Sequence, residues 1–501
     1  MSARADAVLA ASLPSAGTLA LLAAVALMVI AALVPLLRRH PDALPLLAVF
    51  TLPFRVPIAT GGRTVNLLVP LYLVVAAGTL ALLLPRLLAL PKGRARERPA
   101  VMEDAPARRA QNPSLRSVSS WLSPRGLEVI LLATIVLYAL QMSYSSDRVK
   151  ALENIAFFYV PFALLFLMLR DVRWTRQLLA RCLGVAVVLA VIFAGVGFVE
   201  YARKSLLLNP KVVAADQYSN YFRVNSVFFD PSIYGRFLAL VMIVVMAAVL
   251  VAPGAGTARA GAATTAATDG RLDDAVRRRR EILAGAAVLA WLLAGMVTSF
   301  SQSSIAALLL GLAVLGAWCW GVRPTVYLAG TLLALALAFV ALAPAGLHFG
   351  LKGEKGSAAN ATSGRTTLVS GGLELFAKRP LEGYGSGSFE TQYKRNSKTD
   401  AVNATSASHT IPVTVAAEQG VIGLAMYVAL LVSAFAVLFK GAGRSPPRMA
   451  IAACFAALVL HTWTYADFLE DPFTWALLAV GVALSRLDGR WASEARACSA
   501  T

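Results

Sequence analysis

The chain has 501 residues, of which 58% are hydrophobic, and it has a mean hydropathy of +0.67 and a formal net charge of +19. This composition is too apolar for a soluble protein of that length, and it is typical of a bundle of membrane spans about 20 residues long. Basic loops lying against anionic lipid headgroups explain the positive charge, so we do not expect nucleic-acid binding. The sequence therefore predicts an all-α, polytopic transmembrane protein.

Apolar runs that could cross a bilayer recur along the chain and predict 12 or 13 spans. The candidate runs are 17–36, 43–59, 65–86, 126–144, 151–169, 177–199, 233–252, 282–299, 303–321, 324–346, 411–439, 449–467 and 472–486. The first lacks the charged start and cleavage pattern of a signal peptide, so we expect a retained helix. The second is the weakest. Its Arg55, flanked by Pro53 and Pro57, suits either a broken helix lining a cavity or an arginine that snorkels to the headgroups.

Basic residues in the connecting segments predict the orientation, because cytoplasmic loops carry the excess of Lys and Arg. Segment 91–125 is basic and predicted to be disordered, and segment 253–280 ends in four consecutive arginines. Placing both in the cytoplasm puts the C-terminal tail inside as well and segments 200–232 and 347–410 outside. The sequence thus predicts a multi-pass protein of the cytoplasmic membrane, with the side of the N-terminus left open.

The long polar segment 347–410 is predicted to lie outside and to contain short amphipathic helices. It has eight basic and five acidic residues, an excess that a phosphate-bearing partner would favour. From Arg365 to Lys378 the pattern predicts a helix on the bundle surface, because Leu368, Leu375 and Phe376 share one face.

Glycines and a histidine in this segment have two interpretations each. Gly385 and Gly387 follow the predicted helix and suit either plain loop geometry or a close approach of backbone N–H groups to phosphate or sugar oxygens. His409 is either an interfacial residue or a catalytic one. Glu418, further along the next span, is either a buried structural carboxylate or a substrate ligand.

The other outer segment brings two arginines and an aspartate close in sequence. Asp230 precedes Pro231 and so resembles a helix cap, although its spacing of seven from Arg223 also allows a shared helix face. Arg223 is the residue type suited to bidentate phosphate binding, and Arg236 lies just inside the following span.

Four stretches in order resemble the bacterial O-antigen ligase and O-antigen polymerase family of membrane glycosyltransferases. They are R-V-N-S-V-F-F-D-P-S-I-Y-G from Arg223 to Gly235, T-S-F-S-Q-S-S from Thr298 to Ser304, G-R-T-T-L-V-S-G-G-L-E-L-F-A-K-R-P-L-E-G-Y-G-S-G-S-F from Gly364 to Phe389, and S-H-T-I-P-V-T-V-A-A-E-Q-G-V-I-G-L from Ser408 to Leu424. The resemblance covers roughly 220–430. We therefore expect N-terminal helices in 1–200, an O-antigen ligase-like domain in 201–440, and C-terminal helices with a tail in 441–501.

The resemblance implies a GT-C-like helical bundle that transfers a glycan from a polyprenyl-diphosphate carrier to a glycan or glycolipid acceptor, without metal or cofactor. The arginines and histidine on which family members rely fall on Arg223, Arg365 and His409. The chain departs from the family at Thr410, where Asn is common. It also lacks the aromatic residue often found soon after the loop arginine.

The chemistry of these residue types agrees with that implication. Displacing a diphosphate from an anomeric carbon builds negative charge on the leaving group, which Arg223 and Arg365 could stabilise. His409 could remove the acceptor proton or bind the diphosphate or acceptor. A single displacement predicts inversion of the configuration at the anomeric carbon. The sequence has no D-x-D pair that would suggest a metal site. Lower-ranked candidates for substrate binding are Asp230, Arg236, Gly385, Gly387 and Glu418.

A membrane transporter or flippase for an anionic solute or glycolipid is the alternative. Such a protein would be expected to show related halves and paired charges in mid-span, and the sequence shows neither clearly. Ligase and polymerase activity both stay open, because the acceptor depends on the shape of the site.

Overall fold

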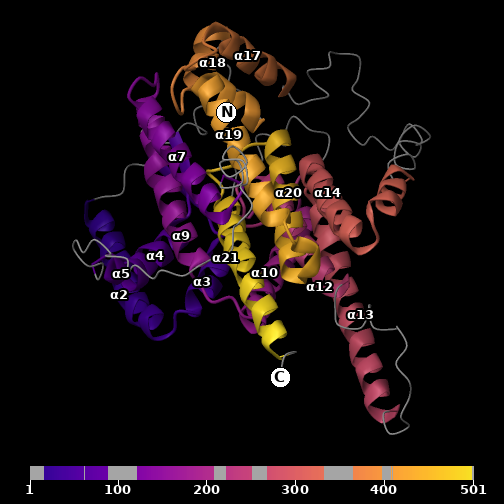
Figure 1. The fold of residues 1–501 in the computed structure, drawn as a ribbon. Helices are drawn as coiled ribbons and strands as arrows, with labels where there is room; N and C mark the ends of the chain where they lie inside the picture. Colours follow the sequence, from indigo (N-terminus) through magenta and orange to yellow (C-terminus); the bar gives the residue numbers. More distant parts are fainter. Residues whose placement is uncertain are drawn as a thin grey trace, which may run out of the picture.

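The computed structural model is a bundle of long helices (Figure 1). The residues it describes are 16–60, 63–88, 121–207, 222–250, 268–331, 365–397, 408 and 410–498. Within these ranges, nine helical stretches are long and apolar enough to cross a membrane. They are α2 (Ala16–Arg39), α4 to α5 (Val69–Leu88), α7 (Pro124–Met142), α8 to α9 (Arg148–Arg170), α10 (Arg176–Arg203), α12 (Pro231–Leu250), α13 (Thr268–Thr298), α14 (Gln302–Cys319) and α19 (Ile411–Phe439). The predicted class, an all-α multi-pass membrane protein, is confirmed.

The remaining elements are shorter or connect these stretches. π-helical turns join α4 (Val69–Gly78) through η1 (Thr79–Leu83) to α5 (Leu84–Leu88), and α8 (Arg148–Asn154) through η2 (Ile155–Tyr159) to α9 (Val160–Arg170). The others are α3 (Ala43–Thr51), α17 (Arg365–Lys378), α18 (Phe389–Ser397), η3 (Ala442–Arg444), α20 (Pro446–Thr464) and α21 (Pro472–Cys498). Residues 322–331 are helical, and the rest of the predicted span 324–346 lies outside the described residues, as does most of segment 91–125.

The predicted span at 43–59 is wrong. Its helix, α3, has nine residues, which at 1.5 Å per residue reach only about half of the hydrocarbon core. An antiparallel pair of strands follows, β1 (Val56–Thr60) and β2 (Arg63–Leu67). Proline explains the change, because Pro53 and Pro57 have no N–H to donate to a continuing helix. Arg55, between them, lies over the ring of Phe229, 5.1 Å from its centre.

Helix α12 lies at the centre of the bundle. Every residue from Pro231 to Ile243 is buried, and α12 packs against α13, α14 and α20. A helix that is apolar on all sides is expected where other helices surround it. Arg236, the exception in this apolar sequence, therefore lies inside the protein and not against lipid.

The bundle has two ends of different character (Figure 1). We call the end that carries α17 and α18 the loop end. The opposite end, where α13 begins and where α21 finishes, we call the basic end, because the run Arg277–Arg280 lies in the first half of α13.

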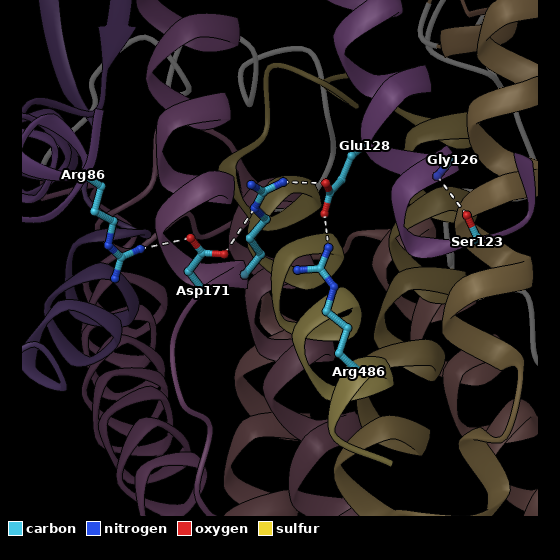
Figure 2. A network of polar contacts seen from close by, with 7 residues as sticks. Arg86, Ser123, Gly126, Glu128, Asp171 and Arg486 are labelled. Carbon is cyan, nitrogen blue, oxygen red and sulfur yellow. Dashed lines mark hydrogen bonds and ion pairs between the residues drawn. The ribbon is translucent and has the colours of Figure 1, made fainter. Parts of the chain in front are cut away.

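Ion pairs join four helices at the basic end (Figure 2). Glu128 at the start of α7 contacts Arg170 at the end of α9, at 2.6 Å, and Arg486 of α21, at 2.5 Å. Asp171 contacts Arg86 of α5 at 3.0 Å. Ion pairs near the protein surface contribute about 1 kcal/mol or less each, but these pairs require the helix ends to lie together. The grouping agrees with the sequence prediction, which puts the loops at these four ends on one side of the membrane.

Helix α19 is broken at one residue where the long loop docks against it. Gly420 has φ 65° and ψ −164°, outside the helical region. The carbonyl of Leu381 approaches so closely that a Cβ atom at position 420 would collide with it. The Val421 N–H, released from the helix by the break, donates to the Pro380 carbonyl at 2.7 Å. The break thus fixes the turn after α17 to the bundle.

Replacing Gly420 with alanine is expected to destabilise the protein. Backbone strain at a positive φ alone costs roughly 1–3 kcal/mol, and the collision with Leu381 adds to it. The matched control is Gly184→Ala in α10, where a Cβ atom meets nothing within 4 Å and helix propensity favours alanine by up to about 1 kcal/mol. Thermal unfolding in detergent compares the two variants, and equal midpoints would contradict the role given to Gly420.

Candidate functional site

The first two sequence motifs contact each other at the loop end. The Val224 N–H donates to the Thr298 carbonyl at 3.3 Å, where α13 ends. The Arg223 Nε–H donates to the Ser299 carbonyl at 3.1 Å. Arg223 is half-buried. Its contact with the Ser299 carbonyl holds the guanidinium against the turn between α13 and α14.

Serines of the second motif surround a buried histidine. Ser301 caps the start of α14, and its hydroxyl accepts the Ser304 N–H. The Nε2 atom of His461, on α20, lies 3.3 Å from the Ser303 hydroxyl and 3.4 Å from the Ser304 hydroxyl. Ser304 also donates to the Ser232 carbonyl at the start of α12. Helices α12, α14 and α20 thus meet at serine hydroxyl groups, and the small size of the serine side chains allows the helices to pack closely.

A buried ion pair lies one turn deeper. Arg236 and Asp471 form the pair, and their exposed fractions are 1% and 0%. The Nε and Nη1 atoms of Arg236 have no hydrogen-bond partner among the described residues. Asp230 caps α12 by accepting the Ser232 N–H at 2.6 Å. Asp230 therefore has the hydrogen bond expected of a helix cap. The charge of Arg236 is balanced by Asp471, in the loop between α20 and α21.

The third and fourth motifs also contact each other. The Glu418 carboxylate accepts the Gly387 N–H at 2.9 Å and the Phe389 N–H at 3.0 Å, while its own carbonyl accepts the Gly385 N–H at 2.8 Å. A Cβ atom on Gly387 would lie 2.9 Å from the backbone nitrogen of Ala151, and one on Gly385 would collide with the backbone of the loop before α8. These contacts favour the loop-geometry interpretation of Gly385 and Gly387 and a structural role for the Glu418 carboxylate. That these three residues bind substrate stays a prediction.

The loop between α20 and α21 contacts α12 through Asp471 and α8 through Glu470. Asn154 donates to the Tyr138 hydroxyl at 2.8 Å and to the Glu470 carboxylate at 3.1 Å. Burial, with the charge of Asp467 as the second cause, raises the pKa of the Glu470 carboxyl to about 8. Sequence reasoning missed Glu470 and Asp471. The signal that could have found them is D-F-L-E-D at 467–471, three acidic residues between two apolar runs.

The three residues predicted to be catalytic are described to different extents. Arg223 lies at the loop end as given above. Arg365 begins α17, whose predicted bounds are confirmed, with Leu368 and Leu375 buried on its inner face, but its side chain lies outside the described part. His409 lies outside the described residues. Convergence of the three side chains on one spot stays a prediction.

Removing the charge of Asp471 is expected to destabilise the protein strongly. In Asp471→Asn, Arg236 is left as an uncompensated buried charge, which costs about 3–5 kcal/mol. The double variant Arg236→Met, Asp471→Leu should recover most of this loss, because no buried charge is left. Glu281→Gln is the control, since it removes the exposed partner of Arg277 and should change stability by about 1 kcal/mol or less. Unfolding in detergent measures all three, and a similar midpoint for Asp471→Asn and Glu281→Gln would refute the prediction.

The raised pKa of Glu470 predicts a pH dependence of stability. The folded protein prefers the neutral acid, so the stabilising contribution is complete below the ordinary pKa of 4.5 and is lost as the pH rises through about 8. We expect the unfolding midpoint to fall over this range, and Glu470→Gln, which is uncharged throughout, to fall less. Glu390→Gln on α18 is the control and should keep the wild-type slope. Identical slopes for wild type and Glu470→Gln would show that Glu470 does not titrate in this range.

Residues 287–428 match the family model described as O-antigen ligase. The matched range runs from α13 to α19 and includes three of the four motifs, while the stretch from Arg223 to Gly235 precedes it. No curated protein matches the chain. The match supports a glycosyltransferase type of activity in the membrane and confirms the family recognised from the motifs. The chain is thus a polytopic membrane protein in which residues 287–428 are similar to the O-antigen ligase family.

Proposed function

We propose that the protein transfers or polymerises a glycan from a polyprenyl-diphosphate carrier onto an acceptor hydroxyl at the outer face of the cytoplasmic membrane. The observation that carries the proposal is the assembly of the four motifs into two contacting pairs at the loop end. The basic segments at the opposite end support a cytoplasmic location for that end. The loop end then faces outward, where a flipped lipid-linked glycan is presented.

Arginines are assigned the stabilisation of the leaving group. Departure of the diphosphate leaves negative charge in a region of low dielectric, where positioned guanidinium groups act strongly. Arg223 suits this role, because its Nε–H donates to the Ser299 carbonyl and this contact holds the guanidinium at the loop end. Arg365 is the second such group, at the start of α17. The proposal therefore needs no metal for charge stabilisation.

Arg236 contributes differently in this proposal. Asp471 neutralises it, so it adds little net charge toward a diphosphate. Its Nε and Nη1 groups could donate hydrogen bonds to substrate, or the ion pair could position the start of α12, and Asp230 with it. The substrate roles of Asp230, Gly385, Gly387 and Glu418 have weaker support, since each has a structural partner in the protein.

The acceptor step is assigned to His409. As the acceptor oxygen bonds to the anomeric carbon, its proton moves to the imidazole while the carbon–diphosphate bond breaks. Neighbouring arginines would keep that imidazole neutral and able to accept the proton. A single displacement inverts the anomeric configuration, and the linkage in the product, compared with that in the donor, tests this step.

Substitution of the three proposed catalytic residues should abolish glycan assembly. We expect Arg223→Ala, Arg365→Ala and His409→Ala each to lose activity with normal membrane levels, because each removes a charge or proton acceptor from the reaction. The control is Arg395→Ala, an exposed arginine of α18 on the same outer loop, which should keep activity. Surface glycans of a deletion strain carrying each variant provide the measurement.

An assay with purified protein separates the proposed function from transport. A lipid-linked donor and acceptor should be consumed together in detergent, where no compartments exist. A ladder of products indicates a polymerase, and a single transfer indicates a ligase. Movement of solute across liposomes without consumption of the donor would contradict the proposal and favour a transporter.

A further inference from the structure

An apolar groove of about 330 Å³ lies between α10, α12 and α13, toward the basic end. Aliphatic side chains from all three helices line it, among them Leu183, Val187, Val249 and Ile282. Its polar lining comes from Arg278 and Glu281. The groove therefore combines a hydrocarbon-lined body with a charged end.

Small residues on two helices create the groove. Ala248 of α12 and Ala284 of α13 line it, as does Gly285, which is so near α12 that a Cβ atom would lie 2.6 Å from Val249 Cγ2. The helices thus touch at Gly285 and leave space beside it. In a membrane, that space is filled by hydrocarbon, because an apolar cavity offers water no hydrogen-bond partners.

Arg278 differs from the three arginines beside it. Arg277, Arg279 and Arg280 are exposed, and Arg277 pairs with Glu281 at 3.2 Å. Arg278 is half-buried and lines the groove. Among the residues whose side chains the structure describes, which on α13 begin at Val276, none forms an ion pair with Arg278. One guanidinium of the run is therefore directed to the groove while its neighbours face the surroundings.

The depth of Arg278 suits a lipid phosphate. The apolar span of α13 is counted from Val276, so position 278 lies near the boundary between hydrocarbon and headgroups. From 268 to 281, α13 has five arginines against three aspartates and one glutamate, a small positive excess that the run at 277–280 concentrates next to the groove. The cytoplasmic leaflet, to which this end is predicted to belong, carries the anionic lipids. Guanidinium is also the side-chain group that matches phosphate geometry best.

We propose that this groove binds one acyl chain of an anionic phospholipid, with the lipid phosphate on Arg278. A chain in the groove would fill the gap between α10, α12 and α13. The same three helices carry Glu200, Asp230 and Thr298 toward the loop end, so the lipid stabilises the scaffold of the candidate site without touching substrate. The inference stands apart from the proposed glycan transfer.

The test uses the full chain purified in detergent, with phosphatidylglycerol and phosphatidylcholine carrying identical acyl chains as probes. Retained lipid is measured by native mass spectrometry, and the unfolding midpoint is a second readout. Wild type should retain phosphatidylglycerol in preference and be stabilised by it. Arg278→Gln should reduce that retention about fivefold, the size of one basic residue's attraction to an anionic lipid. Arg279→Gln, which removes the same charge from the exposed side, should reduce it much less.

Two further measurements separate the parts of the site. Ala248→Phe should fill the groove and lower retention of phosphatidylglycerol with no change in charge. Glycerol phosphate, a headgroup without chains, should leave the midpoint unchanged. Equal losses in Arg278→Gln and Arg279→Gln, equal retention of the two lipids, no effect of Ala248→Phe, or full stabilisation by glycerol phosphate would each overturn the proposal. None of these readouts depends on glycan transfer.

Discussion

The ion pair between Arg236 and Asp471 is the interaction on which the loop end depends. A charge inside a helical bundle has no water to solvate it, so it must find a partner in the protein. Arg236 lies on the central helix α12, and Asp471 belongs to the loop between α20 and α21. Pairing them ties the start of α12 to the last two helices of the chain. The first motif contains the start of α12 and the second contacts it through Ser304, so the same ion pair holds both.

Glu418, a second buried acid, joins the third and fourth motifs, as Asp471 joins the start of α12 to the last two helices. The Glu418 carboxylate accepts the N–H groups of Gly387 and Phe389, where the turn leads into α18. Next to the break of α19 at Gly420, the Val421 N–H donates to the Pro380 carbonyl, just before that turn. Loops held through backbone atoms vary little in position. Such rigidity is what catalysis by pre-positioned charges requires, since a donor that must first be ordered loses much of its advantage. The architecture thus suits a reaction that relies on arginines placed by loops.

Local patterns in the sequence predicted part of this structure, and distant contacts account for the rest. Helix 365–378 was predictable because its apolar residues recur at helical spacing. The span at 43–59 was mispredicted because mean hydropathy does not register the N–H groups that Pro53 and Pro57 lack. Asp471 could not be assigned a role, since its partner Arg236 lies far away in sequence. The two meanings of Gly385 and Gly387 could be weighed only once the protein backbone beside them was known.

The positive charges that contribute to the net charge of +19 lie in different surroundings at the two ends of the bundle. At the basic end, Arg279 and Arg280 are exposed, and lipid phosphates or water can solvate them, so a large excess of positive charge is tolerated there. At the buried core of the loop end, Arg236 persists only with Asp471 beside it. Total charge is therefore a poor guide to the substrate, because exposed arginines such as Arg279 and Arg280 add to it without lying at the candidate site. The informative cations are those that the fold positions, which are Arg223 on its backbone carbonyl and Arg278 in its groove.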